Sequence, residues 1–212
     1  MSILKSQDII DIFDGYDPQG EDGYSHFSVI VPLVRTGDDE SLRVLYEVRS
    51  NKIDRQPGEI CFPGGFLEEG EGPLEGGLRE MEEETGIPAS SVQIITKLPS
   101  LFIGGCSQLH AFLGIIDEED LDEASPSEFE VAELFTVPLS WLLENEPELY
   151  RCKYIPSPDE DFPTKKVTGK DSYPWRGGFY KIPVYPEYEG HIIWGLTGRI
   201  TLQFVRDIIK RV

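Results

Sequence analysis

The sequence predicts a protein of the α/β or α+β class, with strands interspersed with helices. Short runs of β-branched and aromatic residues recur along the chain and are separated by Gly, Pro and Asp, as in β-rich folds. Between these runs lie segments whose apolar residues recur at helical spacing. At 212 residues the chain can bury a sizeable core, and we expect one domain over residues 1–212.

The first elements in chain order are a helix and a hairpin. Residues 5–14 predict a short amphipathic helix, with Ser6 placed to cap it. The segments HFSVIVPLVRT (26–36) and LRVLYEVRS (42–50) predict two strands joined by the turn GDDES. We therefore expect the two strands to pair as a hairpin.

Three further strands are expected in the middle of the chain. SVQIITKL (91–98) and LHAFLGII (109–116) predict two of them around a glycine-containing loop. In EFEVAELFTVPLSWLLEN (128–145), Pro138 is expected to end the third strand before a short helix around Trp141.

The last part of the chain holds one irregular segment and one helix. Residues 151–189 are rich in Pro, Gly and aromatic residues and predict a long functional loop or an irregular strand pair, because their aromatics can pack. The final residues predict a helix with Ile200, Phe204, Ile208 and Ile209 on one face.

The charge balance excludes several partners. The chain has 19 basic and 39 acidic residues, a formal net charge of −20, which disfavours binding to nucleic acid and to anionic lipid. No window approaches the roughly 18 apolar residues of a membrane span, and the first residues lack the basic start and apolar run of a signal peptide. Three cysteines without a CxxC pair suit a reducing compartment, so we expect a cytoplasmic protein.

An acidic helix is predicted at residues 73–85. Pro73 suits the first turn of a helix and Gly86 suits the position just past its end. Leu74, Leu78 and Met81 fall on one stripe, which we expect to face the core.

Three carboxylates of this helix converge. At about 100° per residue, Glu80, Glu83 and Glu84 share an arc of roughly 100°, whereas Glu82 points elsewhere. Hard divalent cations take such oxygen ligands, so one reading is a Mg²⁺ or Mn²⁺ site and the other is a solvated acidic face. Gly76 and Gly77 each cost roughly 1 kcal/mol relative to Ala, which close packing of the helix on a sheet would offset.

The stretch GFLEEGEGPLEGGLREMEEETGI (65–87) resembles the Nudix box, G-x5-E-x7-R-E-U-x-E-E-x-G-U, where U is a bulky apolar residue. All of its fixed positions are matched, by Gly65, Glu71, Arg79, Glu80, Met81, Glu83, Glu84, Gly86 and Ile87. The resemblance implies an α/β/α sandwich around a mixed β-sheet. It also implies hydrolysis of a nucleoside diphosphate linked to another group.

Carried over position by position, the resemblance implies roles for individual residues. Glu80, Glu83, Glu84 and the carbonyl of Gly64 would bind the metal. Arg79 would orient a carboxylate, and Glu71 would support the site. The general base stays open between Glu80 in the box and Glu130 in a later loop.

The segment RSNKIDRQPGEICFPGG (49–65) resembles the one that precedes the box in coenzyme A pyrophosphatases. Arg49, Ser50 and Phe62 match that pattern, and Asp54 stands where it has an arginine, with Arg55 one place later. Upstream, Tyr46 and Glu47 replace its Leu-Thr pair. The resemblance implies substrate contacts by Arg49, Ser50, Arg55 and Phe62; the alternative for the two arginines is a surface ion pair.

The expected function is metal-dependent hydrolysis of coenzyme A or acyl-coenzyme A to 3',5'-ADP and (acyl-)4'-phosphopantetheine. The alternatives are an ADP-ribose or NADH pyrophosphatase and a ligand-sensing module without catalysis. Aromatics of the 151–189 segment either stack on adenine or belong to a core; the residues concerned are Tyr173, Trp175, Phe179 and Tyr180. This segment would close over the substrate or over a second subunit of a homodimer.

Overall fold

The computed structural model describes residues 24–37, 41–104 and 107–211, so the helix expected at residues 5–14 lies outside the described residues. The elements in chain order are β1 (Ser25–Thr36), β2 (Ser41–Arg49), β3 (Ile60–Cys61), β4 (Gly64–Phe66), α2 (Pro73–Thr85), the 3₁₀ turn η1 (Ala89–Ser91), β5 (Gln93–Ile103), β6 (Ser107–Asp117), α3 (Glu118–Asp122), β7 (Val131–Pro138), α4 (Leu139–Glu144), β8 (Glu148–Tyr154), α5 (Thr164–Thr168), β9 (Gly178–Val184) and α6 (Gly195–Ile209).

Seven strands of the described chain form one mixed sheet. Its main path is β3-β2-β1-β6-β5, with β4 also pairing with β1 and β7 with β2. The central pair, β1 and β6, is parallel, and the other pairs are antiparallel. The expected β1–β2 hairpin is present, and β5 and β6 extend further into the glycine-containing loop than predicted.

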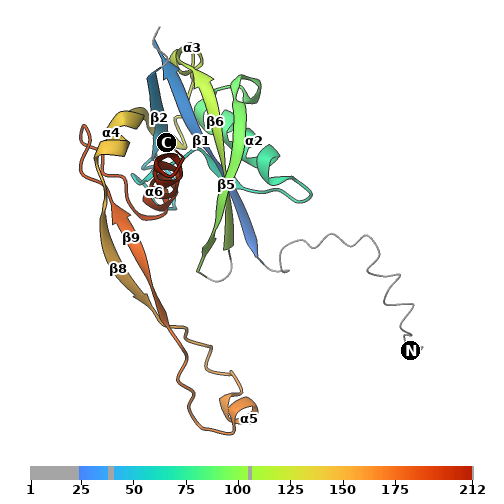
Figure 1. Ribbon diagram of the computed structural model, residues 1–212. Coiled ribbons are helices and arrows are strands. Elements are labelled where there is room, and N and C mark those ends of the chain that lie inside the picture. The colour runs from blue at the N-terminus through green and yellow to red at the C-terminus, as the bar shows by residue number, and fades with distance from the viewer. Residues whose placement is uncertain (1–23, 38–40, 105–106, 212) are drawn as a thin grey trace, which may run out of the picture.

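Helices cover both faces of the sheet, with α2 on one side and α6 on the other (Figure 1). Side chains of β1 alternate between the two sides, as the period of two along a strand requires. Ile30 and Val34 pack with Met81 of α2, whereas Val31 and Leu33 pack with Phe204 of α6. The α/β/α sandwich around a mixed sheet is thus confirmed.

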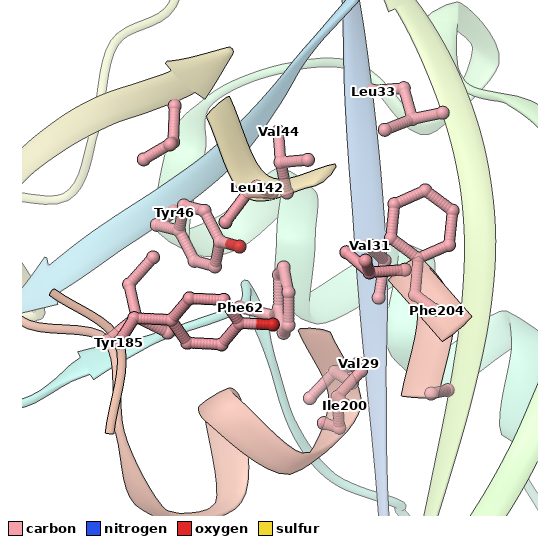
Figure 2. Packing of buried hydrophobic residues seen from close by; sticks show 14 of the residues in the cluster. Val29, Val31, Leu33, Val44, Tyr46, Phe62, Leu142, Tyr185, Ile200 and Phe204 are labelled. Carbon is pink, nitrogen blue, oxygen red and sulfur yellow. The ribbon is translucent and has the colours of Figure 1, made fainter. Parts of the chain in front are cut away.

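The core on the α6 side is rich in aromatic rings. Figure 2 shows Tyr46, Phe62 and Tyr185 gathered beside Ile200 of α6. The Tyr46 and Phe62 ring centroids are 4.8 Å apart, and the Tyr46 hydroxyl lies 3.0 Å from Thr201 Oγ1. Because the buried Tyr46 hydroxyl has Thr201 as a hydrogen-bond partner, a tyrosine is accommodated where the pattern of the coenzyme A pyrophosphatases has leucine.

Two predicted helix faces need correction. Leu74 is 36% exposed, and the buried side of α2 is formed by Gly76, Gly77, Met81, Glu84 and Thr85. A Cβ on Gly77 would lie 2.7 Å from Ser28 Oγ, so this glycine lets the helix approach β1 closely. A Cβ on Gly76 would lie 2.4 Å from Leu67 Cδ2, so Gly76 instead lets the loop between β4 and α2 pack on the helix. In α6, Ile200 and Phe204 are buried as expected, but Ile209 is 56% exposed near the end of the helix.

Residues 148–184 form a hairpin that projects from the sandwich, with α5 near its tip (Figure 1). We call this segment the arm and the remaining described residues the body. The two strands of the arm, β8 and β9, pair antiparallel over seven positions. The strand-pair reading of residues 151–189 is therefore the right one. Within the described residues, no helix has both the length and the apolar character needed to cross a bilayer.

Candidate active site

A pocket of about 610 Å³ opens where the box, the segment before it and the start of α6 meet. Its lining includes charged side chains from β2, α2 and the loops around them, and apolar side chains from β1, β5, β6 and α6. Charged and apolar side chains in one cavity suit a ligand that has a charged group and an apolar body. The side chains discussed below that line it are Arg49, Arg55, Phe62, Phe66, Glu80, Glu84, Glu130, Trp194 and Thr197.

Strand β4 is held tightly against β1 at Gly64, its first residue. Its φ of +147° is rarely adopted by other residues, and a Cβ there would lie 2.2 Å from the Ser28 carbonyl oxygen. The Gly64 N–H donates a hydrogen bond of 2.8 Å to Glu84 Oε2. The glycine thereby brings backbone and carboxylate together at the rim of the pocket.

Arg79 is the hub of the box. Its Nε lies 2.8 Å from Glu71 Oε1, and its Nη1 lies 2.9 Å from Glu80 Oε1 and 3.2 Å from Glu83 Oε2. The hydrogen bonds from this guanidinium lower the pKa of Glu71. Glu82 makes no such contact and accepts a hydrogen bond from the Ala89 N–H. The structure therefore groups Glu71, Glu80 and Glu83 around the Arg79 guanidinium. Of these residues, Glu83 is not among those that line the pocket.

Glu47 was not among the site residues predicted from the sequence. Its side chain is 0% exposed, one oxygen accepts a hydrogen bond of 3.0 Å from the Cys61 thiol, and the other has no hydrogen-bond partner. Burial raises the pKa of both Glu47 and Glu84. The negative charge of Glu47 raises the pKa of Glu84 further, and the charges of Glu130 and Glu80 do the same for Glu47. The sequence did contain a signal for this residue. Glu47 stands where the pattern of the coenzyme A pyrophosphatases has a threonine, so an acid replaces a neutral residue there.

The donor set of this region fits a divalent cation. Glu80 and Glu84 supply hard oxygen ligands, and Glu47 leaves a buried carboxylate oxygen without a partner. Burial also raises the pKa of Glu80, so positive charge nearby would favour the ionised form of these acids. In the described part of the chain, no three His, Cys, Asp or Glu side chains are grouped so that they could hold an ion as they stand. A metal would have to compete with Arg79 for Glu80 and Glu83.

Two arginines supply the positive charge of the pocket lining. Arg49 donates from Nε to the Arg55 carbonyl at 3.2 Å, and the Arg55 guanidinium lies 5.6 Å from the Phe66 ring centroid. Asp54 is exposed and is not a lining residue. Ser50 is also outside the lining: it is buried in a turn, where its hydroxyl accepts a hydrogen bond from the Lys52 N–H. Arg55 thus reaches the site although it is displaced by one position from the related pattern.

The aromatic residues at the pocket come from the sandwich itself. Phe62 is 3% exposed and forms part of the wall, and Trp194, which is 45% exposed, lines it at the start of α6. The aromatics proposed from the 151–189 segment lie on the arm and are not lining residues.

Glu130 is exposed in the loop before β7 and lines the pocket. Its backbone carbonyl accepts a hydrogen bond of 2.8 Å from the Ser50 N–H, which ties this loop to the end of β2. Both candidates for the general base, Glu80 and Glu130, are therefore at the cavity.

Comparison with known proteins identifies relatives for most of the chain. A family model described as the NUDIX domain matches residues 25–153. The chain is 34% identical over 149 residues to the peroxisomal coenzyme A diphosphatase NUDT7 of Mus musculus, covering 66% of this chain and 59% of the relative. It is 36% identical over 125 residues to Nudix hydrolase 3 of Caenorhabditis elegans, covering 58% and 51%. The chain thus spans between half and three-fifths of the length of these two relatives.

Among solved structures, a MutT/nudix family protein from Enterococcus faecalis shares the fold. The TM-score is 0.51 at 14% identity, and the match covers 97% of this chain and 70% of that one. At this identity the likeness concerns the fold alone.

Proposed function

Since the chain belongs to the Nudix family, we propose that it is a metal-dependent hydrolase of the pyrophosphate bond in a nucleoside diphosphate derivative, with coenzyme A or acyl-coenzyme A as its substrate. The observation that carries this proposal is the pocket. It places Glu80 and Glu84 of the box in one cavity with Arg49 and Arg55. Carboxylates for a metal and guanidinium groups for phosphate are the two needs of this chemistry.

The metal ligands we propose are Glu80, Glu83, Glu84 and the carbonyl of Gly64. When bound, Mg²⁺ or Mn²⁺ supplies positive charge for the diphosphate oxygens and activates water for attack on phosphorus. Arg79 holds Glu71, Glu80 and Glu83 in place before the metal binds. Glu130 or Glu80 accepts the proton of the attacking water.

Arg49 and Arg55 support coenzyme A as the substrate. Both line the pocket, and the planar fork of a guanidinium suits a diphosphate or a 3'-phosphate. Asp54, the acid that departs from the related pattern, lies outside the lining and so does not place negative charge on the cavity wall. The name of the mouse relative points to the same substrate for that protein, and to peroxisomes, whereas we predict a cytoplasmic protein here.

The substrate is tested by incubating purified protein with Mg²⁺ or Mn²⁺ and coenzyme A, acetyl-coenzyme A, ADP-ribose or NADH, and separating the products by chromatography. We expect metal-dependent release of 3',5'-ADP from coenzyme A. The 3'-phosphate contact is tested by comparing kcat/KM for coenzyme A and 3'-dephospho-coenzyme A in wild type and Arg55→Ala. Equal kcat/KM values in wild type would contradict a specific grip on that phosphate. Preference for ADP-ribose or NADH would overturn the choice of substrate but keep the reaction.

The metal role is tested with two neighbouring variants. Glu83→Gln should lower kcat by at least about 100-fold, because it removes a proposed ligand. Glu82→Gln is the matched control, since it makes the same chemical change one residue away on the same helix and should retain activity. Unchanged turnover in Glu83→Gln would rule out its proposed role. Absence of turnover with every substrate would instead favour a ligand-sensing module.

A further inference from the structure

The arm is unusual among the elements of this protein because almost none of it is buried. A two-stranded hairpin without a third strand is only marginally stable in water. Every hydrogen bond, ion pair and ring contact of described residues 155–177 stays inside the arm, and Figure 1 shows the arm extending away from the sandwich. The outer half of the arm therefore gains no support from its own body.

The two faces of the hairpin differ in chemistry. Side chains alternate along β8 and β9, so Tyr150, Tyr154 and Tyr180 lie on one face, and they are 54%, 53% and 43% exposed. The other face carries Arg151, Lys153 and Lys181, together with Phe179, whose ring centroid lies 3.4 Å from the Arg151 guanidinium carbon. One face is thus aromatic and the other basic.

Among the described residues, the basic face has no acidic ion-pair partner. Arg151 lies directly opposite Lys181 in the strand register, and like charges in this position destabilise a hairpin. The ion pairs of the described residues include neither of these two side chains, nor Lys153. An acidic surface placed against this face would relieve the repulsion.

The chain itself carries such a surface. The arm holds 7 of the 19 basic residues but only 5 of the 39 acidic ones, so its net charge is +2 and that of the rest of the chain is −22. Two copies of a chain with a charge of −20 would otherwise repel each other. The arm has the opposite sign of charge from the rest of the chain, so a contact between the arm of one copy and the body of another is attractive.

We propose that the arm binds the acidic body of a second copy of this chain, and that the two arms are exchanged in a symmetric homodimer. In a two-fold dimer each body receives the arm of its partner, so the contact is made twice. The basic face meets carboxylates of the partner, and the exposed tyrosines supply the amphipathic rings that protein interfaces favour. The proposal is independent of the substrate and of catalysis.

The test is the molar mass in solution, measured by analytical ultracentrifugation across protein concentration. We expect twice the chain mass of 23.9 kDa at micromolar concentration, and weaker association at high salt because exposed charges are screened. A wild-type protein that stays at 23.9 kDa at all concentrations would overturn the proposal.

The decisive variant is Arg151→Glu/Lys181→Glu. It keeps a like-charge pair across the strands and reverses the charge offered to a partner, but it also removes the contact of Arg151 with the Phe179 ring. The circular dichroism spectrum of the variant therefore has to be compared with that of wild type. We expect the dimer dissociation constant to rise at least about 10-fold. Lys97→Glu/Lys210→Glu is the control, because it changes the net charge equally at exposed positions of the body and should leave a dimer.

Three other results would count against the arm as the dimer contact. Equal weakening of the dimer by the arm variant and the control would mean that net charge alone governs association. An arm variant that stays dimeric, with an unchanged circular dichroism spectrum, would place the interface elsewhere. A monomeric wild type in which the arm variant raises KM would mean that the arm closes over its own pocket.

Discussion

Replacing Gly64 by alanine should destabilise the protein strongly, because two separate costs meet at this residue. The φ of +147° is strained for any residue with a Cβ, which costs about 1–3 kcal/mol. The new methyl group would also lie 2.2 Å from the Ser28 carbonyl oxygen and 2.6 Å from Val29 Cα. Both are backbone atoms of a central strand, so relief requires backbone movement, and such overpacking costs about 1–3 kcal/mol. The sum is about 2–6 kcal/mol.

The assay is thermal unfolding, with Gly190→Ala as the matched control. Gly190 also has a positive φ, +87°, but a Cβ there meets nothing within 4 Å, so only the conformational cost applies. At roughly 2–4 °C per kcal/mol for a chain of this size, Gly64→Ala should unfold at least about 4 °C below wild type and clearly below the control. Equal melting temperatures for the two variants would refute the reasoning that the contact with β1 is decisive.

Three further predictions concern the core, pH and the metal. Thr201→Val leaves the buried Tyr46 hydroxyl without its hydrogen-bond partner at 3.0 Å and should lower the free energy of unfolding, measured in urea, by about 1–3 kcal/mol. Thr201→Ser keeps the hydroxyl and should lower it less. Equal losses of stability in the two variants would contradict the hydrogen-bond explanation. Burial, Lys97 and His26 lower the pKa of His110, so the unfolded chain binds this proton more readily. Stability should fall as pH drops below about 6.5, and His110→Gln should flatten that fall; parallel pH profiles would exclude His110 as its source. A chelator should abolish hydrolysis and added Mn²⁺ should restore it and raise the melting temperature, whereas chelator-resistant turnover would contradict a metal site.

Local sequence signals predicted most elements of the sandwich. Pro73 and Gly86 bound α2 as expected, and Pro138 is the last residue of β7 before α4. These predictions succeeded because Pro and Gly act through their own backbone preferences, which depend little on distant residues. The β1–β2 hairpin was likewise visible as two β-branched runs around a short turn.

Predictions that depended on distant residues fared less well. Leu74 was expected in the core because it shares a stripe with Met81, but the sheet packs on the glycine face of α2 instead. A helical wheel ranks faces by hydrophobicity and cannot register that Gly77 permits a closer approach of the helix to β1. The aromatics of residues 151–189 were visible, but their positions on an exposed arm depend on a strand pairing that the wheel and the composition do not reveal.

The sequence by itself determined the spacing of the box, and hence the chemical types available: carboxylates on one arc of a helix, an arginine beside them and a glycine before them. Only the tertiary structure decided which of these groups share a cavity. It brought Arg49 and Arg55 from before the box, Glu130 from after it and Trp194 from the start of α6 to one pocket. It also buried Glu47 and Glu84, and it placed Glu47 close enough to raise the pKa of Glu84 by its negative charge. Electrostatic coupling depends on distance and burial through the folded chain, and neither is a property of sequence spacing.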